Sequence, residues 1–301
     1  MNDVLVVVRS IGELTEQLCC SIIVEQVGKD NIVIIHEKPF VEAVRKTFEL
    51  GIASQKKWTL AIDADILIRK NAIKDLIEWA ENQEDYFFEF QGRVVDKFFC
   101  GPRQGGPHLY RTKYFRKALE FLPKDKNALR PESFTYDKMA EVGFHYYHYN
   151  EIYGIHDYFQ FYKDIYRKAF LHAHKHGKNV GYFIRQWAKY KEDDYRIALK
   201  GLIDGLSFNK KVEVNVDFFK EFIDKNLDGL IEKQFIANDA RDNIDRIIES
   251  WKIDEDSVEF EKQLFKERRS DKRKLTSKFS LLYKIGNMFL RIGNKLIQFG
   301  K

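Results

Sequence analysis

Trp58-Thr59-Leu60-Ala61-Ile62-Asp63-Ala64-Asp65-Ile66-Leu67-Ile68 is the stretch of sequence that decides the fold. An apolar and β-branched run of this length is typical of a strand that is buried on both faces. Buried carboxylates are costly unless they are paired, and a divalent cation is a common partner. Because residues i and i+2 of a strand point to the same side, we expect Asp63 and Asp65 to bring their oxygens to one metal ion or metal-bound phosphate.

Short apolar runs alternate with helical patterns on either side of this stretch. The predicted strands Val4–Val8 and Ile32–Ile35 precede it, and Asn71 is a candidate cap for a helix that ends near Glu81. This alternation predicts right-handed crossovers and a parallel sheet, in which ligands bind beyond the carboxyl ends of the strands. The polar residues expected at those ends are Arg9, Ser10, Glu37, Asp63 and Asp65.

The pattern changes after the first 81 residues. Tyr86 to Cys100 is strand-like, a Gly-rich turn is expected over Gly101–Pro107, and helical patterns dominate from about Tyr114, including a helix over Asp157–His176. The predicted fold class is therefore α/β: a mixed, largely parallel, Rossmann-like sheet flanked by helices, with a helical C-terminal extension.

Composition narrows the class of protein. The chain has 301 residues, 44% hydrophobic and 32% charged, which is typical of a folded globular protein. No apolar run is long enough to span a bilayer, and a strand-like run begins at Val4, so no signal peptide is expected. The three cysteines are too few for a disulfide framework. We expect a cytoplasmic protein.

Asp63-Ala64-Asp65 at the end of a third strand resembles the DxD motif of GT-A fold glycosyltransferases, in a family-2-like form. The resemblance continues in the order of other segments: Val7–Glu13 looks like the first strand and turn that cradle the nucleotide, Gly105–Thr112 like the turn beside the donor sugar and acceptor, and Tyr153–Tyr158 like the late loop-to-helix junction. It covers about Asp3 to Lys175 and implies Mn²⁺ or Mg²⁺ as cofactor, with a UDP- or GDP-sugar as donor.

The resemblance also implies roles for individual residues. Asp63 and Asp65 would bind the metal with His156 as a third ligand, and Asp157, expected at the start of a helix, would be the catalytic base. A surface or helix-capping acid pair, a hydrogen-bonded histidine and a helix N-terminal charge are the structural alternatives. The residues expected to bind the donor are Arg9, Ser10, Glu37, Lys46, Ala64 and Arg111, and those on the acceptor or sugar side are Gly105, Gly106 and His108.

The C-terminal end has a different composition from the rest of the chain. No acidic residue follows Asp271, and apolar residues recur there at helical spacing beside basic ones. We expect residues 279–301 to lie on an anionic membrane surface, or alternatively to pack on protein or form a dimer helix. The predicted domains are 1–207 (catalytic), 208–270 (helical extension) and 271–301 (basic amphipathic tail). The sequence contains no recognisable nucleic-acid-binding module.

These observations predict a metal-dependent, hexosyltransferase-type glycosyltransferase that is peripherally associated with the membrane. It would transfer a sugar from a nucleotide-sugar to a hydroxyl of a glycan or lipid-linked acceptor, in surface polysaccharide or glycolipid biosynthesis. Two alternatives stay open: a phosphohydrolase of the haloacid-dehalogenase type, which also places D-x-D after an apolar strand, and a non-catalytic membrane-associated scaffold.

Overall fold

The computed structural model describes residues 3–230, 232 and 235–251. These residues form two compact units. The sheet unit contains the described residues up to Phe161 and those from Glu213 onward, and the helical unit is Tyr162–Val212. This division differs from the predicted one at residue 207, because the chain leaves the sheet unit at 161 and returns to it at 213. The predicted tail, 271–301, lies outside the described residues.

The sheet unit is built on a seven-stranded sheet with the strand order β2-β1-β3-β6-β5-β7-β4. β1 is parallel to β2 and β3, and β5 is parallel to β7, whereas β6 is antiparallel to both of its neighbours and β4 is antiparallel to β7. The α/β class and the mixed sheet are confirmed, with a larger antiparallel share than "largely parallel" implies. The strands are β1 (Val4–Arg9), β2 (Ile32–Ile35), β3 (Trp58–Asp63), β4 (Ile66–Ile68), β5 (Phe87–Asp96), β6 (Gly101–Arg111) and β7 (His145–His156).

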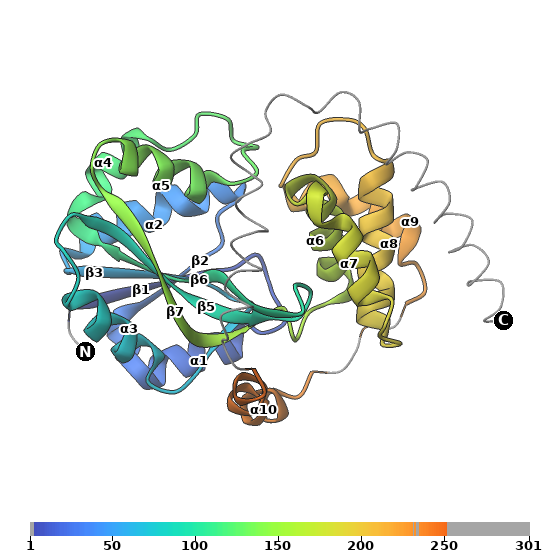
Figure 1. Ribbon diagram of the computed structural model, residues 1–301, viewed down its shortest axis with the longest axis horizontal. Coiled ribbons are helices and arrows are strands. Elements are labelled where there is room, and N and C mark those ends of the chain that lie inside the picture. The colour runs from blue at the N-terminus through green and yellow to red at the C-terminus, as the bar shows by residue number, and fades with distance from the viewer. Residues whose placement is uncertain (1–2, 231, 233–234, 252–301) are drawn as a thin grey trace. The chain divides into compact units, whose positions relative to one another are not determined.

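Helices cover both faces of this sheet (Figure 1). α1 and α3 pack on one face together with α10, and α2, α4 and α5 pack on the other. β1 shows why the sheet is covered twice, since Val4, Val6 and Val8 face the first layer while Leu5 and Val7 face the second. The helices of this unit are α1 (Glu16–Val27), α2 (Phe40–Ser54), α3 (Ala72–Glu81), α4 (Phe115–Glu120), α5 (Pro131–Glu141), α9 (Lys220–Asn226) and α10 (Ala237–Glu249).

The second half of the sheet departs from the sequence-based prediction. The expected Gly-rich turn at 101–107 is wrong, because these residues form the first part of β6. The aromatic segment before Asp157 is also a strand, β7. Its Tyr153 ring occupies the space that a side chain at Gly92 of β5 would need, so glycine is what allows this pair of strands to approach.

The helical unit has a simpler construction. α6 packs against α8, and Gly201 and Gly205 permit the approach, because a Cβ at either position would lie 2.3 or 2.4 Å from a carbonyl oxygen of α6. The helices of this unit are α6 (Tyr162–Lys175), α7 (Val180–Trp187) and α8 (Asp193–Ser207). Among the described residues, no helix has both the length and the apolar character needed to cross a membrane.

Gly154 offers a test of how closely β4 and β7 must approach. A Cβ at Gly154 would lie 2.5 Å from the Leu67 carbonyl oxygen, so we expect Gly154→Ala to lower the free energy of unfolding by about 1–3 kcal/mol. Gly177→Ala is the control, since nothing lies within 4 Å of its added Cβ. Urea unfolding of both variants makes the comparison. Equal stability of Gly154→Ala and the wild-type protein would contradict this packing.

Candidate metal centre

Three strand ends meet at one edge of the sheet and bring acidic residues to a histidine. Asp96, the last residue of β5, is in register with His156, the last residue of β7, and Ile66, the first residue of β4, also pairs with His156. Asp65 comes directly before β4 and Asp157 directly after β7. The parallel β5–β7 pair and the antiparallel β4 therefore place all four polar side chains around one point.

The imidazole of His156 lies between these carboxylates. Its Nδ1 is 2.7 Å from Asp96 Oδ2, while its Nε2 is 3.5 Å from Asp65 Oδ1 and 3.4 Å from Asp157 Oδ1. Ligand atoms of Asp65, His156 and Asp157 all lie within 4.8 Å of one another, and all three residues are largely buried. A metal-ligating histidine commonly bonds a carboxylate through its other ring nitrogen, as Asp96 does here.

Charge within the cluster is unevenly shared. Burial alone would lower the pKa of His156, but Asp157, Asp65 and Asp96 raise it to about 10. Burial likewise opposes ionisation of Asp96, yet Arg103 and His156 hold the pKa of this carboxyl far below its usual range. Buried acids gathered in this way require a cation. Two carboxylates and an imidazole with an outer carboxylate partner fit a divalent ion such as Mn²⁺.

Asp63, a predicted metal ligand, lies outside this cluster. β3 ends at Asp63, so the alternation that would have aligned it with Asp65 stops there, and Ala64 and Asp65 form a turn. Asp63 Oδ1 instead accepts a hydrogen bond of 2.7 Å from Nε of Arg9, which is buried. The structure therefore groups Asp65 and His156 with Asp157 in place of Asp63.

Arg9 joins Asp63 to a second buried network. Its Nη1 donates to Glu132 Oε1 at 2.6 Å, and Tyr110 OH donates to the same oxygen at 2.9 Å. Although burial opposes it, Arg9 and His108 lower the pKa of Glu132 to about 2. Arg9 Nη2 has no hydrogen-bond partner within the described part of the chain. Arg9 therefore keeps one buried guanidinium nitrogen whose hydrogen-bonding capacity is unused within the described residues.

His108 belongs to this network and does not face an open surface. Its Nδ1 lies 2.8 Å from Oε1 of Glu89, which is fully buried, and 3.2 Å from Tyr136 OH. Burial would lower the pKa of His108, but Glu132 and Glu89 raise it. His108 is 8% exposed, so its predicted place on the acceptor side is not supported by its surroundings.

The other predicted donor-binding residues near this edge are placed as follows. Ser10 Oγ lies within hydrogen-bonding distance of Glu13 and Glu16 in the segment that leads from β1 to α1, which begins at Glu16. Glu37 is exposed in the loop after β2. Lys46 lies half-buried in α2. Ala64 is fully buried; its N–H donates to the Arg9 carbonyl and its carbonyl accepts from Thr15 Oγ1.

Arg111 lies at the opposite end of the sheet. It pairs with Trp58, the first residue of β3, because β6 runs antiparallel to β3. Arg111 therefore lies at the other end of β3 from Asp63, and its predicted role in donor binding stays a prediction. Gly105 and Gly106 do lie near the acid cluster: a Cβ at Gly105 would meet Arg103 Nη1 at 2.2 Å, and Arg103 Nε bonds Asp96 Oδ2 at 2.6 Å.

Asp157 does not begin a helix. It follows β7 directly with a φ of 64°, and α6 starts only at Tyr162. A left-handed conformation is uncommon for a residue other than glycine, and such residues gather at functional sites. This conformation carries the Asp157 side chain back toward His156.

Sequence reasoning missed the acids Asp96, Glu89 and Glu132 of these networks. Asp96 follows Val94 and Val95 at the end of an apolar run, which is the same signal that drew attention to Asp63. Glu132 lies on α5, and its approach to Arg9 depends on how that helix packs over the sheet. No local sequence pattern predicts the contact between Glu132 and Arg9.

Comparison with known proteins gives a likeness of fold only. No family model and no curated protein matches the chain. Solved structures that do match include a mannosyltransferase from Pyrobaculum calidifontis in complex with GDP-Man and Mn²⁺ (12% identity, 87% of this chain, 84% of that chain, TM-score 0.37). A cytidylyltransferase from Leptospira borgpetersenii also matches, with 9% identity over 78% of this chain and 98% of that chain and a TM-score of 0.37. A glycosyltransferase involved in the glycosylation of the major capsid of PBCV-1 matches with 10% identity over 49% of this chain and 81% of that chain and a TM-score of 0.34. These likenesses assign no reaction to this chain.

The metal centre can be tested by measuring which aspartates are needed for Mn²⁺ binding. We expect Asp96→Asn, which removes the outer carboxylate, to lower Mn²⁺ affinity roughly 10–100-fold, and Asp65→Asn to lower it at least as much. Asp63→Asn is the matched control and should leave the affinity almost unchanged. Electron paramagnetic resonance of free Mn²⁺ during titration gives the dissociation constants. A loss in Asp63→Asn as large as in Asp65→Asn would contradict the grouping described above.

The Arg9–Glu132 pair predicts a pH-dependent stability. Because Glu132 has a pKa of about 2 in the folded protein against an ordinary value of 4.5, its contribution is complete above pH 4.5 and is lost as the pH falls toward 2. We expect Glu132→Gln to cost about 3 kcal/mol at neutral pH, because it leaves a buried guanidinium undercompensated. Guanidinium unfolding as a function of pH should show the difference from wild type narrowing below pH 4.5.

The control for this experiment is Glu120→Gln, which removes a 62% exposed carboxylate paired with Lys117. It should change stability by less than about 1 kcal/mol. If Glu132→Gln lost no more stability at neutral pH than Glu120→Gln, the result would contradict a stabilising role of the Arg9–Glu132 pair.

Proposed function

We propose that this chain is a metal-dependent transferase that moves a sugar from a nucleotide-sugar to a hydroxyl of a glycan or lipid-linked acceptor. The observation that carries the proposal is the buried set of Asp65, His156 and Asp157, backed by Asp96, at the carboxyl edge of the sheet. Binding sites of α/β sheets lie beyond this edge. Asp63, paired with Arg9, reaches the same edge from β3.

Asp65, His156 and Asp157 would hold Mn²⁺ or Mg²⁺ in this proposal. The bound ion would supply Lewis-acid stabilisation to the diphosphate of the departing nucleotide. Asp96 accepts from His156 Nδ1–H, so in a metal-bound imidazole the Nε2 lone pair would face the ion that the two carboxylates share. Arg103 Nε bonds Asp96 Oδ2, which fixes the position of that acid in turn.

Asp157 has a different role here from the catalytic base expected of it. Its Oδ1 lies 3.4 Å from His156 Nε2, within the donor set, and the residue is 2% exposed. A base that deprotonates an acceptor hydroxyl must reach that hydroxyl. We therefore assign Asp157 to the metal.

Arg9 is proposed to face the nucleotide. Its Nη2 is buried and is without a hydrogen-bond partner among the described residues, and charge-assisted donation from a guanidinium suits phosphate and ribose oxygens alike. Asp63 and Glu132 hold the other nitrogens of the group in place. Gly105 and Gly106 remain the proposed sugar side because they lie beside Arg103 and Ile66, whose side chains occupy the space that a Cβ at either glycine would need.

Nucleotide binding and product analysis test the function. We expect thermal stabilisation by UDP- or GDP-sugars in the presence of Mn²⁺, with slow release of nucleoside diphosphate, and loss of both in Asp65→Asn. Asp63→Asn should keep the Mn²⁺ affinity but weaken nucleotide binding, because it loosens Arg9.

Other products would replace this proposal. Metal-dependent release of pyrophosphate from a nucleoside triphosphate would assign nucleotidyl transfer, and hydrolysis of p-nitrophenyl phosphate without turnover of any nucleotide-sugar would assign a phosphohydrolase. The absence of any Mn²⁺-dependent nucleotide binding would leave a non-catalytic protein.

A further inference from the structure

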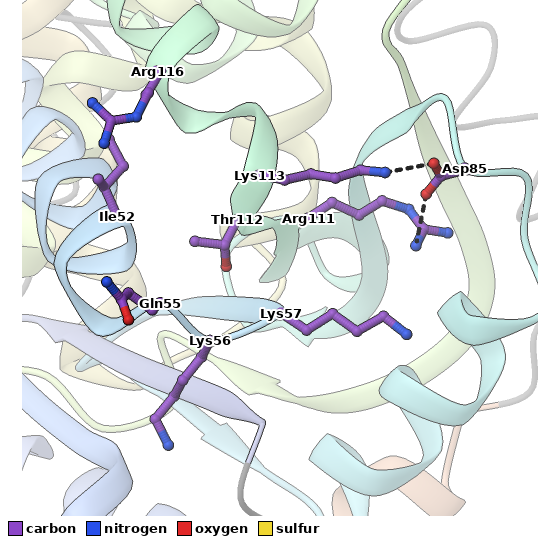
Figure 2. A pocket seen from close by; sticks show the side chains of 9 residues that line it. All are labelled: Ile52, Gln55, Lys56, Lys57, Asp85, Arg111, Thr112, Lys113 and Arg116. Carbon is purple, nitrogen blue, oxygen red and sulfur yellow. Dashed lines mark hydrogen bonds and ion pairs between the residues drawn. The ribbon is translucent and has the colours of Figure 1, made fainter.

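A second polar site lies at the end of the sheet opposite to the acid cluster. A cavity of about 380 Å³ opens where β3 begins and β6 ends (Figure 2). Its lining contains several basic residues and a single acid. These are Lys56, Lys57, Arg111, Lys113, Arg116 and Asp85. The volume lies within the range of cavities that hold small ligands, and the charge excess favours an anion.

Arg111 is the buried part of this site. It is 6% exposed, and its guanidinium lies over the rings of Trp58 (4.8 Å) and Phe90 (5.3 Å). Its Nη2 donates only to backbone carbonyl oxygens, and its Nε has no hydrogen-bond partner in the described part of the chain. All the hydrogen bonds of this buried charge therefore go to neutral carbonyl oxygens, and Asp85 is its nearest acid among the described residues.

Asp85 supplies little compensation for this charge. Its Oδ1 is 3.6 Å from Arg111 Nη1, which is too far for a hydrogen bond, and its carboxylate is 73% exposed. The same carboxylate also pairs with Lys113 Nζ at 2.5 Å. One exposed acid is therefore shared between two cations, and exposed pairs of this kind are weak.

Two lysine side chains of the cavity extend in the same direction as Arg111. Figure 2 shows Lys57, Arg111 and Lys113 extending toward the side on which Asp85 lies, whereas Lys56 and Arg116 point elsewhere. Lys57 and Lys113 are about half exposed and are paired with Glu81 and Asp85 respectively. Exposed pairs are weak, so either ammonium group can turn to a ligand that Arg111 anchors. Planar guanidinium and mobile ammonium groups together match the several oxygens of a phosphate.

We propose that this cavity binds a phosphate monoester carried by a small molecule. Arg111 anchors the phosphate, Lys113 and Lys57 close on its oxygens, and Asp85 competes with it for the same cations. The site is separate from the metal centre, since Arg111 is in register with Trp58 while Asp63 ends the same strand. It requires no divalent ion and does not depend on the transferase proposal.

Phosphorus-31 NMR line broadening of inorganic phosphate tests the site, in the full-length protein with EDTA at constant ionic strength. We expect saturable binding that Lys113→Gln weakens roughly tenfold, the typical effect of losing one hydrogen bond between charged groups. Asp85→Asn removes the competing carboxylate and should tighten binding several-fold by the same reasoning. Both residues are exposed, so neither variant threatens the fold.

The matched control is Lys74→Gln, which removes an equally exposed lysine from α3, outside the cavity. It should leave phosphate binding unchanged. Failure to bind phosphate, or equal effects of Lys74→Gln and Lys113→Gln, would overturn the proposal. Competition by glucose 6-phosphate or by dihexanoyl phosphatidic acid, whichever acts at the lower concentration, then identifies the phosphate as soluble or lipid-borne. Because EDTA removes the metal, this result is independent of the metal centre.

Discussion

The hydrogen bond between His156 Nδ1 and Asp96 Oδ2 is the interaction on which the candidate site depends. It joins the last residues of two parallel strands, and it turns the second ring nitrogen toward Asp65 and Asp157. With a metal bound, this bond orients the ligand; without one, the imidazole is protonated and itself balances the acids. The same geometry therefore explains how so much negative charge is kept within a folded sheet.

The fold provides for this site through the pairing of strands that are distant in sequence. β4 is short and antiparallel to β7, so Asp65 meets the end of a strand that comes much later in the chain. Gly154 and Gly92 permit the close approach of β7 to its neighbours. The central strands then separate two regions of opposite charge: the acids at one end of the sheet, and the Arg111 cavity at the other.

The first three strands could be predicted, because Val4–Val8, Ile32–Ile35 and Trp58–Ile62 are continuous apolar runs, and β1 and β3 are buried on both faces. β6 and β7 could not be predicted, because they are rich in glycine and in polar aromatic residues. These segments form strands because they pair with neighbouring strands of the sheet. The position of Arg111 could not be predicted for a related reason: a residue that ends an antiparallel strand lies at the opposite edge, and strand direction is not visible locally. The separation of Asp63 from Asp65 could not be predicted either, because it depends on β3 ending at Asp63.

Electron spin echo envelope modulation of bound Mn²⁺ tests whether His156 Nε2 is a metal ligand. We expect nitrogen-14 modulation from a coordinated imidazole in the wild-type protein, and its loss in His156→Gln. The control is His148→Gln, which removes an exposed histidine from the same strand, β7, and should keep the modulation. Modulation that persists without His156, or that is absent from the wild-type protein with Mn²⁺ bound, would contradict the assignment of His156 as a ligand.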